Sequence, residues 1–282
     1  MKTTQTILDE ILVDVRKELA EAKHERPLSE LRRLIADAPP VRPLSVALRS
    51  GFGLIAEIKE RSPSQGEMRM HNVATAPAAY EASEIVHAIS VLTNTSHFGM
   101  RLQHLEGIRH TSTKPVLRKD FIFDEYQVLE ARAFGADAVL LMANLLDADE
   151  MKRLYAVCRE LRMDALFECH DQEQISQVPP GAVLYGINSR TFAVGSGQYA
   201  AARAARESGT KVDATTDLSR FDIGKHLPAT AVKVAESGIH PHNIAAVRDQ
   251  QGFHAALVGT SLLLAEHGVE AELAAFERAL AK

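Results

Sequence analysis

The chain has 282 residues, of which 46% are hydrophobic and 24% charged, and its formal net charge is −5. These values lie near the globular average, so they exclude a disordered chain and allow one large domain or two small ones. Because no dense block of Lys or Arg is present, the sequence has no surface that would track a nucleic-acid backbone, and we expect no nucleic-acid partner.

The N-terminal segment predicts a helical extension. Apolar residues recur there at helical spacing with charges between them, namely Ile7, Leu8, Ile11, Leu12, Val15 and Leu19. The apolar stripe of such a helix must cover another surface. Three prolines, Pro39, Pro40 and Pro43, then interrupt the chain before residues 44–48, so we expect residues 1–50 to be an extension that a linker joins to the main body.

From Gly53 onward, short apolar runs alternate with longer helical patterns, which is typical of βα units around a buried parallel sheet. Eight runs fit strands: 54–58, 88–92, 115–117, 138–141, 165–167, 183–187, 231–235 and 256–258. Eight units favour a closed (β/α)8 TIM barrel over an open doubly wound sheet, and no GxGxxG motif follows the first run. We therefore expect one α/β domain over residues 1–282.

The connection between the sixth and seventh strands, residues 191–230, is long and rich in Ala, Arg, Gly and Ser. Residues 199–206 fit one or two turns of helix, and a flexible loop fits them equally well. Long loops in compact domains are often functional or disordered, so this segment is a candidate lid or interface.

Cysteine and hydropathy patterns indicate the compartment. Cys158 and Cys169 are the only cysteines, too few for a disulfide framework and without zinc-site spacing. The N-terminus reaches Asp9 and Glu10 without an apolar signal core, and no apolar run reaches the roughly 18 residues of a membrane helix. We expect a cytoplasmic protein with no membrane partner.

Polar side chains close five of the eight predicted strands. These residues are Glu57 with Lys59, Lys119, Glu168, Asn188 and Glu236. Catalytic groups gather at the C-terminal ends of barrel strands, and residues two apart on a strand point the same way, so Glu57 and Lys59 share one mouth. Any one of them alone is an ordinary strand-end charge. Their convergence favours a catalytic site.

Two small turns follow the last two strands. They read Glu236-Ser237-Gly238 and Gly259-Thr260-Ser261. Glycine allows close backbone approach, and N–H groups at the start of a helix face an anion, so the pair predicts a phosphate site. A simple tight turn is the alternative for either one alone.

Motifs from six strands resemble, in the same order, those of the indole-3-glycerol-phosphate synthase family. They are Ala56-Glu57-Ile58-Lys59 with Ser62-Pro63-Ser64 and Gly66, Ser90-Val91-Leu92-Thr93, Pro115-Val116-Leu117-Arg118-Lys119-Asp120-Phe121, Gly135-Ala136-Asp137, Gly186-Ile187-Asn188-Ser189-Arg190 and Glu236-Ser237-Gly238-Ile239. The resemblance covers most of the chain. It implies a lyase of tryptophan biosynthesis that needs no cofactor. Its substrate would be 1-(2-carboxyphenylamino)-1-deoxyribulose 5-phosphate, converted to indole-3-glycerol phosphate with loss of carbon dioxide and water.

The resemblance also implies roles for the strand-end residues. Lys119 stands at the general-acid position and would protonate the ribulose carbonyl if cationic neighbours lowered its pKa from about 10.4. Lys59 and Glu57 are placed for the later loss of water, while Glu168 is a further acid–base or cation-stabilising carboxylate. Which carboxylate is the base stays open. The remaining implied contacts are Asn188 with the hydroxyls, Glu236 with the substrate and lysines, Ser62, Ser237, Gly238, Gly259 and Thr260 with the phosphate, Phe98 and Phe121 with the anthranilate ring, and Arg190 with the substrate.

One loop departs from the family pattern. After the second strand the family usually reads Leu-Thr, an acidic residue and Phe-x-Gly-Ser, whereas residues 93–101 read TNTSHFGMR. Arg101 either meets the substrate carboxylate or lies on the surface. The lone histidines His97, His170, His240 and His242 lack ligand spacing, so we predict no metal site.

Two alternatives to the synthase are a barrel paralogue with an altered substrate and a non-catalytic module that binds sugar phosphates. The acid–base set argues against the module, because binding alone needs only the phosphate turns. The expected partner is a small sugar phosphate. A monomer and a homodimer both stay open.

Overall fold

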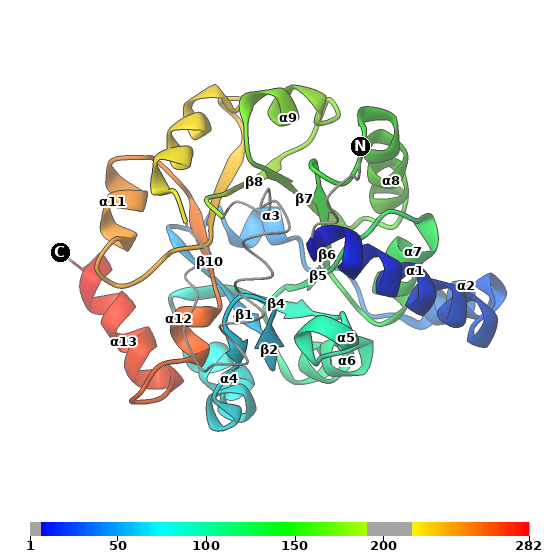
Figure 1. The fold of residues 1–282 in the computed structure, drawn as a ribbon, viewed down its shortest axis with the longest axis horizontal. Helices are drawn as coiled ribbons and strands as arrows, with labels where there is room; N and C mark the ends of the chain where they lie inside the picture. The colour runs from blue at the N-terminus through cyan, green and yellow to red at the C-terminus, as the bar shows by residue number, and fades with distance from the viewer. Residues whose placement is uncertain (1–6, 191–215, 282) are drawn as a thin grey trace, which may run out of the picture.

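The computed structural model describes residues 7–190 and 216–281, and eight parallel strands in it close into a barrel (Figure 1). The strands are β1 Gly53–Ile58, β4 Val86–Leu92, β5 Val116–Lys119, β6 Ala138–Met142, β7 Asp164–Cys169, β8 Leu184–Asn188, β9 Val232–Glu236 and β10 Ala255–Val258. Each pairs with the next along the chain, and β10 pairs with β1 to close the ring. The predicted barrel and its eight strands are confirmed.

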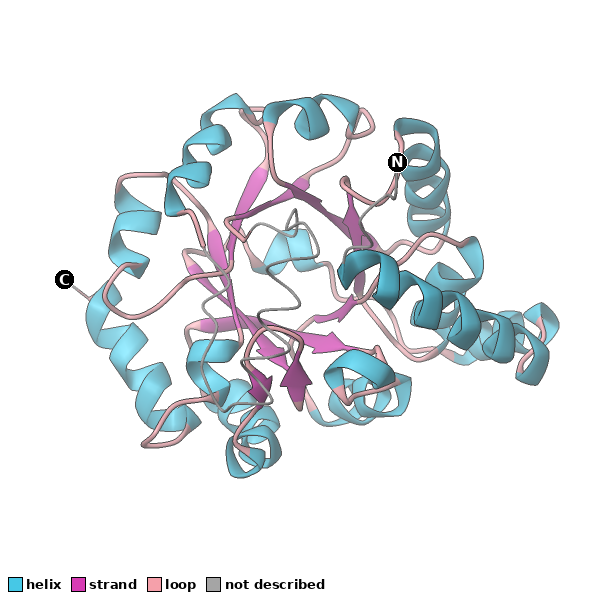
Figure 2. Ribbon diagram, in the orientation of Figure 1, coloured by secondary structure: helices cyan, strands magenta, loops and turns pink. Residues whose placement is uncertain are grey.

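Helices cover the outside of this barrel (Figure 2). They are α4 Met70–Ala82, α6 Leu102–Thr111, α7 Glu125–Ala133, α8 Ala148–Glu160, α9 Gln172–Gln177, the 3-10 helix η1 Leu218–His226, α11 Ile244–Asp249 and α13 Val269–Leu280, with the short α5 Thr95–Phe98 and α12 Thr260–Leu263 before α6 and α13. Four of them start after an aspartate whose carboxylate accepts a first-turn N–H: Asp124, Asp147, Asp171 and Asp217. No helix in the described part of the chain is both long and apolar enough to span a bilayer.

A small antiparallel hairpin follows the first barrel strand. Its strands are β2 Arg61–Ser62 and β3 Gly66–Glu67. Each strand has two residues, which is too short for an alternating pattern, so the hairpin could not be predicted from hydrophobic periodicity. The hairpin carries Ser62 to the mouth of the barrel.

The N-terminal extension closes the barrel at both ends. It consists of α1 Ile7–Glu25, α2 Leu28–Asp37 and α3 Leu44–Ala47. On α1 the buried Ile11, Leu12 and Val15 pack in one cluster with inward-facing residues of the barrel, and Leu44 and Leu48 join the same cluster. Figure 1 shows α1 starting at the rim of the barrel beside β5 and β6 and running outward to α2, whereas α3 is seen through the opening. The predicted amphipathic helix is confirmed, and the surface it covers is the mouth of the barrel.

The proline-rich segment between α2 and α3 is fastened to the barrel. Arg42 donates to the carbonyl oxygens of Ser112 and Lys114 at 2.6 and 2.8 Å, just before β5. Arg109, a buried residue of α6, donates to the carbonyl of Pro40 at 2.8 Å. Side-chain hydrogen bonds therefore hold the segment between α2 and α3 against the barrel.

The long connection after β8 is described only from Thr216 onward. Residues 191–215, including the 199–206 stretch for which a helix and a loop were both considered, lie outside the described residues. Thr216 forms an isolated antiparallel bridge with Arg190, and η1 then follows with Asp217 as its N-cap.

Candidate active site

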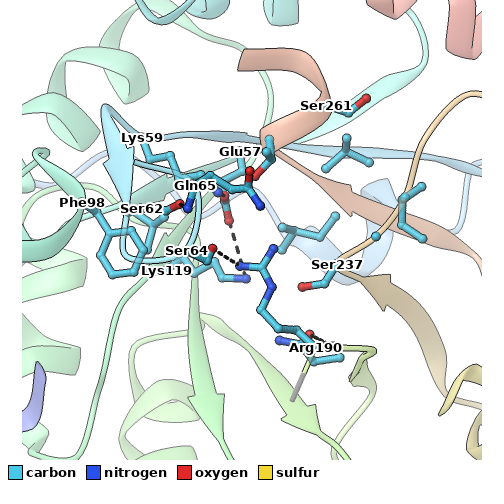
Figure 3. A pocket seen from close by; sticks show the side chains of 18 of the residues that line it. Glu57, Lys59, Ser62, Ser64, Gln65, Phe98, Lys119, Arg190, Ser237 and Ser261 are labelled. Atoms are coloured by element: carbon cyan, nitrogen blue, oxygen red, sulfur yellow. Dashed lines mark hydrogen bonds and ion pairs between the residues drawn. The ribbon is translucent and has the colours of Figure 1, made fainter. Parts of the chain in front are cut away.

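A cavity of about 470 Å³ opens where the barrel strands end at their C-termini (Figure 3). All but one of the predicted site residues line it, namely Glu57, Lys59, Ser62, Phe98, Lys119, Phe121, Glu168, Asn188, Arg190, Ser237, Gly238, Gly259 and Thr260. The exception, Glu236, is fully buried behind the wall and reaches Lys119. The structure thus brings residues from seven of the eight barrel strands, or from the segments that follow them, into one pocket.

Lys119 lies among three buried carboxylates. Its Nζ is 3.0 Å from Glu236 Oε2, 3.6 Å from Glu57 Oε2 and 3.9 Å from Glu168 Oε2. Burial alone would lower the pKa of Lys119, but the three negative charges raise it above its ordinary value. This is the reverse of the lowered pKa that the sequence led us to expect. Lys119 is therefore a charged ammonium group at neutral pH.

Glu57 and Lys59 form a buried ion pair at the end of β1, through Glu57 Oε1 and Lys59 Nζ. Burial alone would raise the pKa of Glu57, yet the ammonium groups of Lys59 and Lys119 lower it to about 2. The pKa of Lys59 is lowered, because burial outweighs the attraction of Glu57. Of the two lysines, Lys59 therefore gives up a proton more readily.

Glu236 has no exposed surface and sits beside Glu168. Burial and the Glu168 carboxylate raise the pKa of Glu236 to about 8, although Lys119 acts in the opposite direction. Within the described residues, Oε1 of each glutamate lacks a hydrogen-bond partner. Two like charges that share a buried site do not both ionise easily, so this pair holds a proton near neutral pH.

Two glycines leave room for these carboxylates. A Cβ added at Gly186 would lie 2.0 Å from Glu236 Oε1, and one added at Gly259 would lie 2.4 Å from Glu57 Oε1. Gly259 was predicted as a phosphate contact, whereas Gly186 was part of a family motif and had no predicted role. Its signal was a lone glycine inside a strand, which marks close approach of another group.

The β5 segment that carries Lys119 is anchored from behind. The buried Arg118 lies 3.0 Å from Asp120 Oδ2 and 3.1 Å from Glu130 Oε2, and Thr93 Oγ1 accepts from its Nε at 3.0 Å. Because neighbouring strand residues point to opposite faces, this network fixes the outer side of the strand while Lys119 faces the pocket. Sequence reasoning gave Arg118 and Asp120 no role.

The turn after β9 has unusual backbone geometry. Ser237 has φ 70° and Gly238 has φ 69°. A positive φ is uncommon in a residue with a side chain and is found often at ligand sites. Two bonds hold the turn: Ser189 Oγ donates to the Ser237 carbonyl at 2.9 Å, and Asn243 Nδ2 donates to the Gly238 carbonyl at 2.8 Å.

The opposite end of the pocket is apolar. The rings of Phe98 and Phe121 are 6.3 Å apart, and Ile11, Leu140 and Met142 line the same cavity. Figure 3 shows Phe98 on one side and Ser237 and Ser261 on the other, with Lys119 and Glu57 between them. Ile11 was not predicted as a pocket residue. The sequence signal that could have identified it was its place on the apolar stripe of α1.

Two arginines named from the sequence can now be placed. Arg101 is exposed at the start of α6 and does not line the cavity, which agrees with the surface alternative. Arg190 points back across the mouth, where its Nη1 donates to Ser64 Oγ at 3.1 Å (Figure 3). Ser64 was part of a quoted motif without a predicted contact.

Known proteins resemble the chain over most of its length. The family model described as indole-3-glycerol phosphate synthase matches residues 8–197. The indole-3-glycerol phosphate synthase of a Nocardioides species is 38% identical over 92% of this chain and 93% of that protein. The synthase of Salinibacter ruber is 37% identical over 94% of this chain and 93% of its own.

Solved structures with much lower sequence identity share the fold. A 3-keto-L-gulonate-6-phosphate decarboxylase from Vibrio cholerae aligns with a TM-score of 0.56 at 15% identity, covering 82% of this chain and 98% of that one. Tryptophan synthase subunit alpha from Legionella pneumophila aligns with a TM-score of 0.54 at 14% identity, covering 86% and 99%. At such identities the likeness supports the barrel alone.

Proposed function

Because the chain belongs to the indole-3-glycerol phosphate synthase family, we propose that the cavity at the barrel mouth is its active site. The protein is a carboxy-lyase of tryptophan biosynthesis. It converts 1-(2-carboxyphenylamino)-1-deoxyribulose 5-phosphate to indole-3-glycerol phosphate, carbon dioxide and water. The observation that carries the site assignment is the convergence of Glu57, Glu168 and Glu236 on Lys119, next to the Glu57–Lys59 pair.

The substrate fits the pocket in one direction. Its aromatic ring lies against the apolar wall that Phe98 and Phe121 form, and its phosphate lies at the turns after β9 and β10, near Ser62. The ribulose portion then crosses Lys119. Holding both ends fixes the aromatic carbon near the carbonyl that it attacks, which makes ring closure an oriented intramolecular step.

Ring closure turns the ribulose carbonyl into a hydroxyl, so negative charge develops on its oxygen and must be met by a proton. Lys119 faces that oxygen. Its raised pKa keeps it charged at neutral pH, so it stabilises the developing charge and delivers the proton as the new carbon–carbon bond forms. The carboxyl group then leaves as carbon dioxide, and its bonding electrons restore the aromatic ring.

The final step removes the hydroxyl as water. Lys59 protonates the leaving oxygen, because its lowered pKa makes it the stronger acid of the two lysines. A carboxylate must take a proton from carbon. Glu57, whose pKa lies near 2, is a weak base, so we assign that role to Glu168 and let Glu57 hold Lys59 in place.

Formation of the indole ring gives a direct test. The chain has no Trp, so indole fluorescence that appears on mixing protein with the carboxyphenylamino deoxyribulose phosphate comes from the product. We expect a rise that depends on enzyme concentration. Binding of the substrate without any rise would instead favour a paralogue with an altered substrate or a binding module.

Glu236 predicts a pH dependence. Its raised pKa means that Glu236 is protonated below about pH 8 and gains a negative charge above it. The substrate carries a carboxylate and a phosphate, so this added charge opposes binding. We expect kcat/KM to fall as pH rises through about 8 and the fall to vanish in Glu236→Gln, measured by initial rates between pH 6 and 10. An unchanged fall in the variant would rule out Glu236 as the titrating group.

We also propose that residues 1–282 form one barrel domain whose first 50 residues are the extension, since α1 and α3 pack into the same interior cluster. Both cysteines are buried free thiols, which supports a reducing cytoplasm as the location.

A further inference from the structure

The short helix α5 lies in the loop that departs from the family pattern, and it contacts two segments that flank the active-site mouth. One is α1, which begins more than 80 positions earlier in the chain. The other is the β2–β3 hairpin, which carries Ser62. Phe98, the last residue of α5, lines the apolar end of the cavity.

Three polar contacts join the α5 region to α1. Glu18 accepts from Asn94 Nδ2 at 3.2 Å and from Ser96 Oγ at 2.7 Å, one bond to each carboxylate oxygen. His97 Nε2 lies 2.9 Å from Asp14 Oδ2. Asn94 is also fixed from the other side, because its Oδ1 accepts the backbone N–H of His97 and caps α5.

Hydrogen bonds to the backbone carbonyls of α5 join this helix to the hairpin. Arg61 Nη2 donates to the carbonyl oxygens of Thr95 and Ser96 at 2.8 and 3.3 Å. The N–H of Glu60 donates to the Phe98 carbonyl at 3.0 Å. A Cβ added at Gly99 would lie 2.7 Å from Glu60 Cβ, so the chain there fits closely against the start of the hairpin.

The contacts matter because of how α1 is held along its length. Its C-terminal half is fastened elsewhere, through Lys23 with Asp124 at 2.7 Å and Tyr126 Oη with the Ala22 carbonyl at 2.7 Å. Its N-terminal half lies over the pocket, where Ile11 lines the cavity. Glu18 lies between these two parts, so its bonds to α5 stop the front half from lifting away from the mouth.

We propose that α5 is a clasp that holds α1 and the β2–β3 hairpin together over the active site, with Glu18 as its positioning residue. The clasp sets the affinity for the aromatic end of the substrate, because Ile11 on α1 and Phe98 on α5 line the same cavity and pack in the same apolar cluster. The inference rests on the proposed placement of the aromatic ring beside Phe98. The proposal assigns a role to the altered loop, because Asn94, Ser96 and His97 all lie in that loop.

The test compares Glu18→Ala with Glu21→Ala. Both changes remove one glutamate from α1, but Glu21 is exposed and makes none of the clasp contacts. Loosening α1 lowers the fraction of protein in the binding-competent form. We therefore expect KM to rise about tenfold in Glu18→Ala, with kcat within about twofold of the unaltered protein. Glu21→Ala should leave both constants unchanged.

Hydrogen exchange separates failure of the clasp from failure of the function. In Glu18→Ala the α1 amides should exchange faster while those of the barrel strands keep their rates. Equal α1 exchange in the two variants overturns the clasp, whether or not the protein turns over substrate. Faster α1 exchange with unchanged KM overturns its role in substrate affinity. If Glu18→Ala misfolds, the surface change Ser96→Ala removes one of the two bonds and should shift KM in the same direction by a smaller factor.

Discussion

Turnover is expected to fall by about 10³- to 10⁴-fold when Lys119 is replaced by alanine or by the longer uncharged methionine. The loss exceeds that of an average acid because Lys119 does two things. It delivers the proton at ring closure, and its ammonium balances the charge of the buried glutamate cluster, whose nearest oxygen is 3.0 Å away. The measurement is the initial rate of indole fluorescence under saturating substrate.

Binding should survive these changes, because the phosphate turns and the aromatic walls are untouched. Calorimetric titration with the substrate whose ribulose carbonyl has been reduced to an alcohol should still give measurable binding to the methionine variant. Lys233→Ala is the matched control, since Lys233 lies near the other end of β9 and does not line the cavity. Normal turnover without Lys119 would remove it from the general-acid role.

The barrel and the acid–base residues could be predicted from local sequence because the strands of a parallel sheet have a recognisable local pattern. Its strands are buried on both faces and read as short apolar runs, as 138–142 and 184–188 do. A polar residue at the end of such a run stands out. Asn188 and Glu236 are the last residues of β8 and β9 and are paired in the sheet. Looking for a polar residue at the end of an apolar run therefore finds both of them.

The electrostatic character of the site could not be predicted in the same way. The general-acid role of Lys119 was made to depend on cationic neighbours, and the sequence does not show which groups surround Lys119 in space. Closure of the barrel instead aims Arg118 away from the pocket and brings carboxylates from β1, β7 and β9 to within 4 Å. The direction of the Lys119 pKa depends on these distances, which only the three-dimensional arrangement fixes.

Contacts between distant segments were missed for a related reason. The apolar stripe of α1 indicated that a surface would be covered, but nothing in the pattern identified the barrel mouth as that surface. Glu18 and Ser96 meet only because α1 lies over the loop after β4. Their residue types are ordinary on an exposed helix and in a loop, so no local rule would select them.

Gly186→Ala is expected to cost at least about 10²-fold in turnover although it adds only one methyl group and Gly186 does not line the cavity. The new Cβ would lie 2.0 Å from Glu236 Oε1, so the carboxylate must move. Glu236 has no exposed surface into which it can relax, and moving it breaks the 3.0 Å contact that orients Lys119. The rate of indole formation measures the loss.

The pH profile decides whether such a loss acts through Glu236 or through general damage to the barrel. If the methyl group displaces Glu236, the decline in kcat/KM near pH 8 should disappear from Gly186→Ala as it does from Glu236→Gln. A damaged barrel would lower the rate at every pH and keep the decline.

The matched control is Gly107→Ala on α6, where an added Cβ meets no atom within 4 Å. This change should leave turnover intact and stabilise the fold by roughly 0.5–1 kcal/mol, because alanine is the better helix former. Full activity in Gly186→Ala would mean that Glu236 can reach Lys119 from another position, and the carboxylate cluster would then need no fixed geometry.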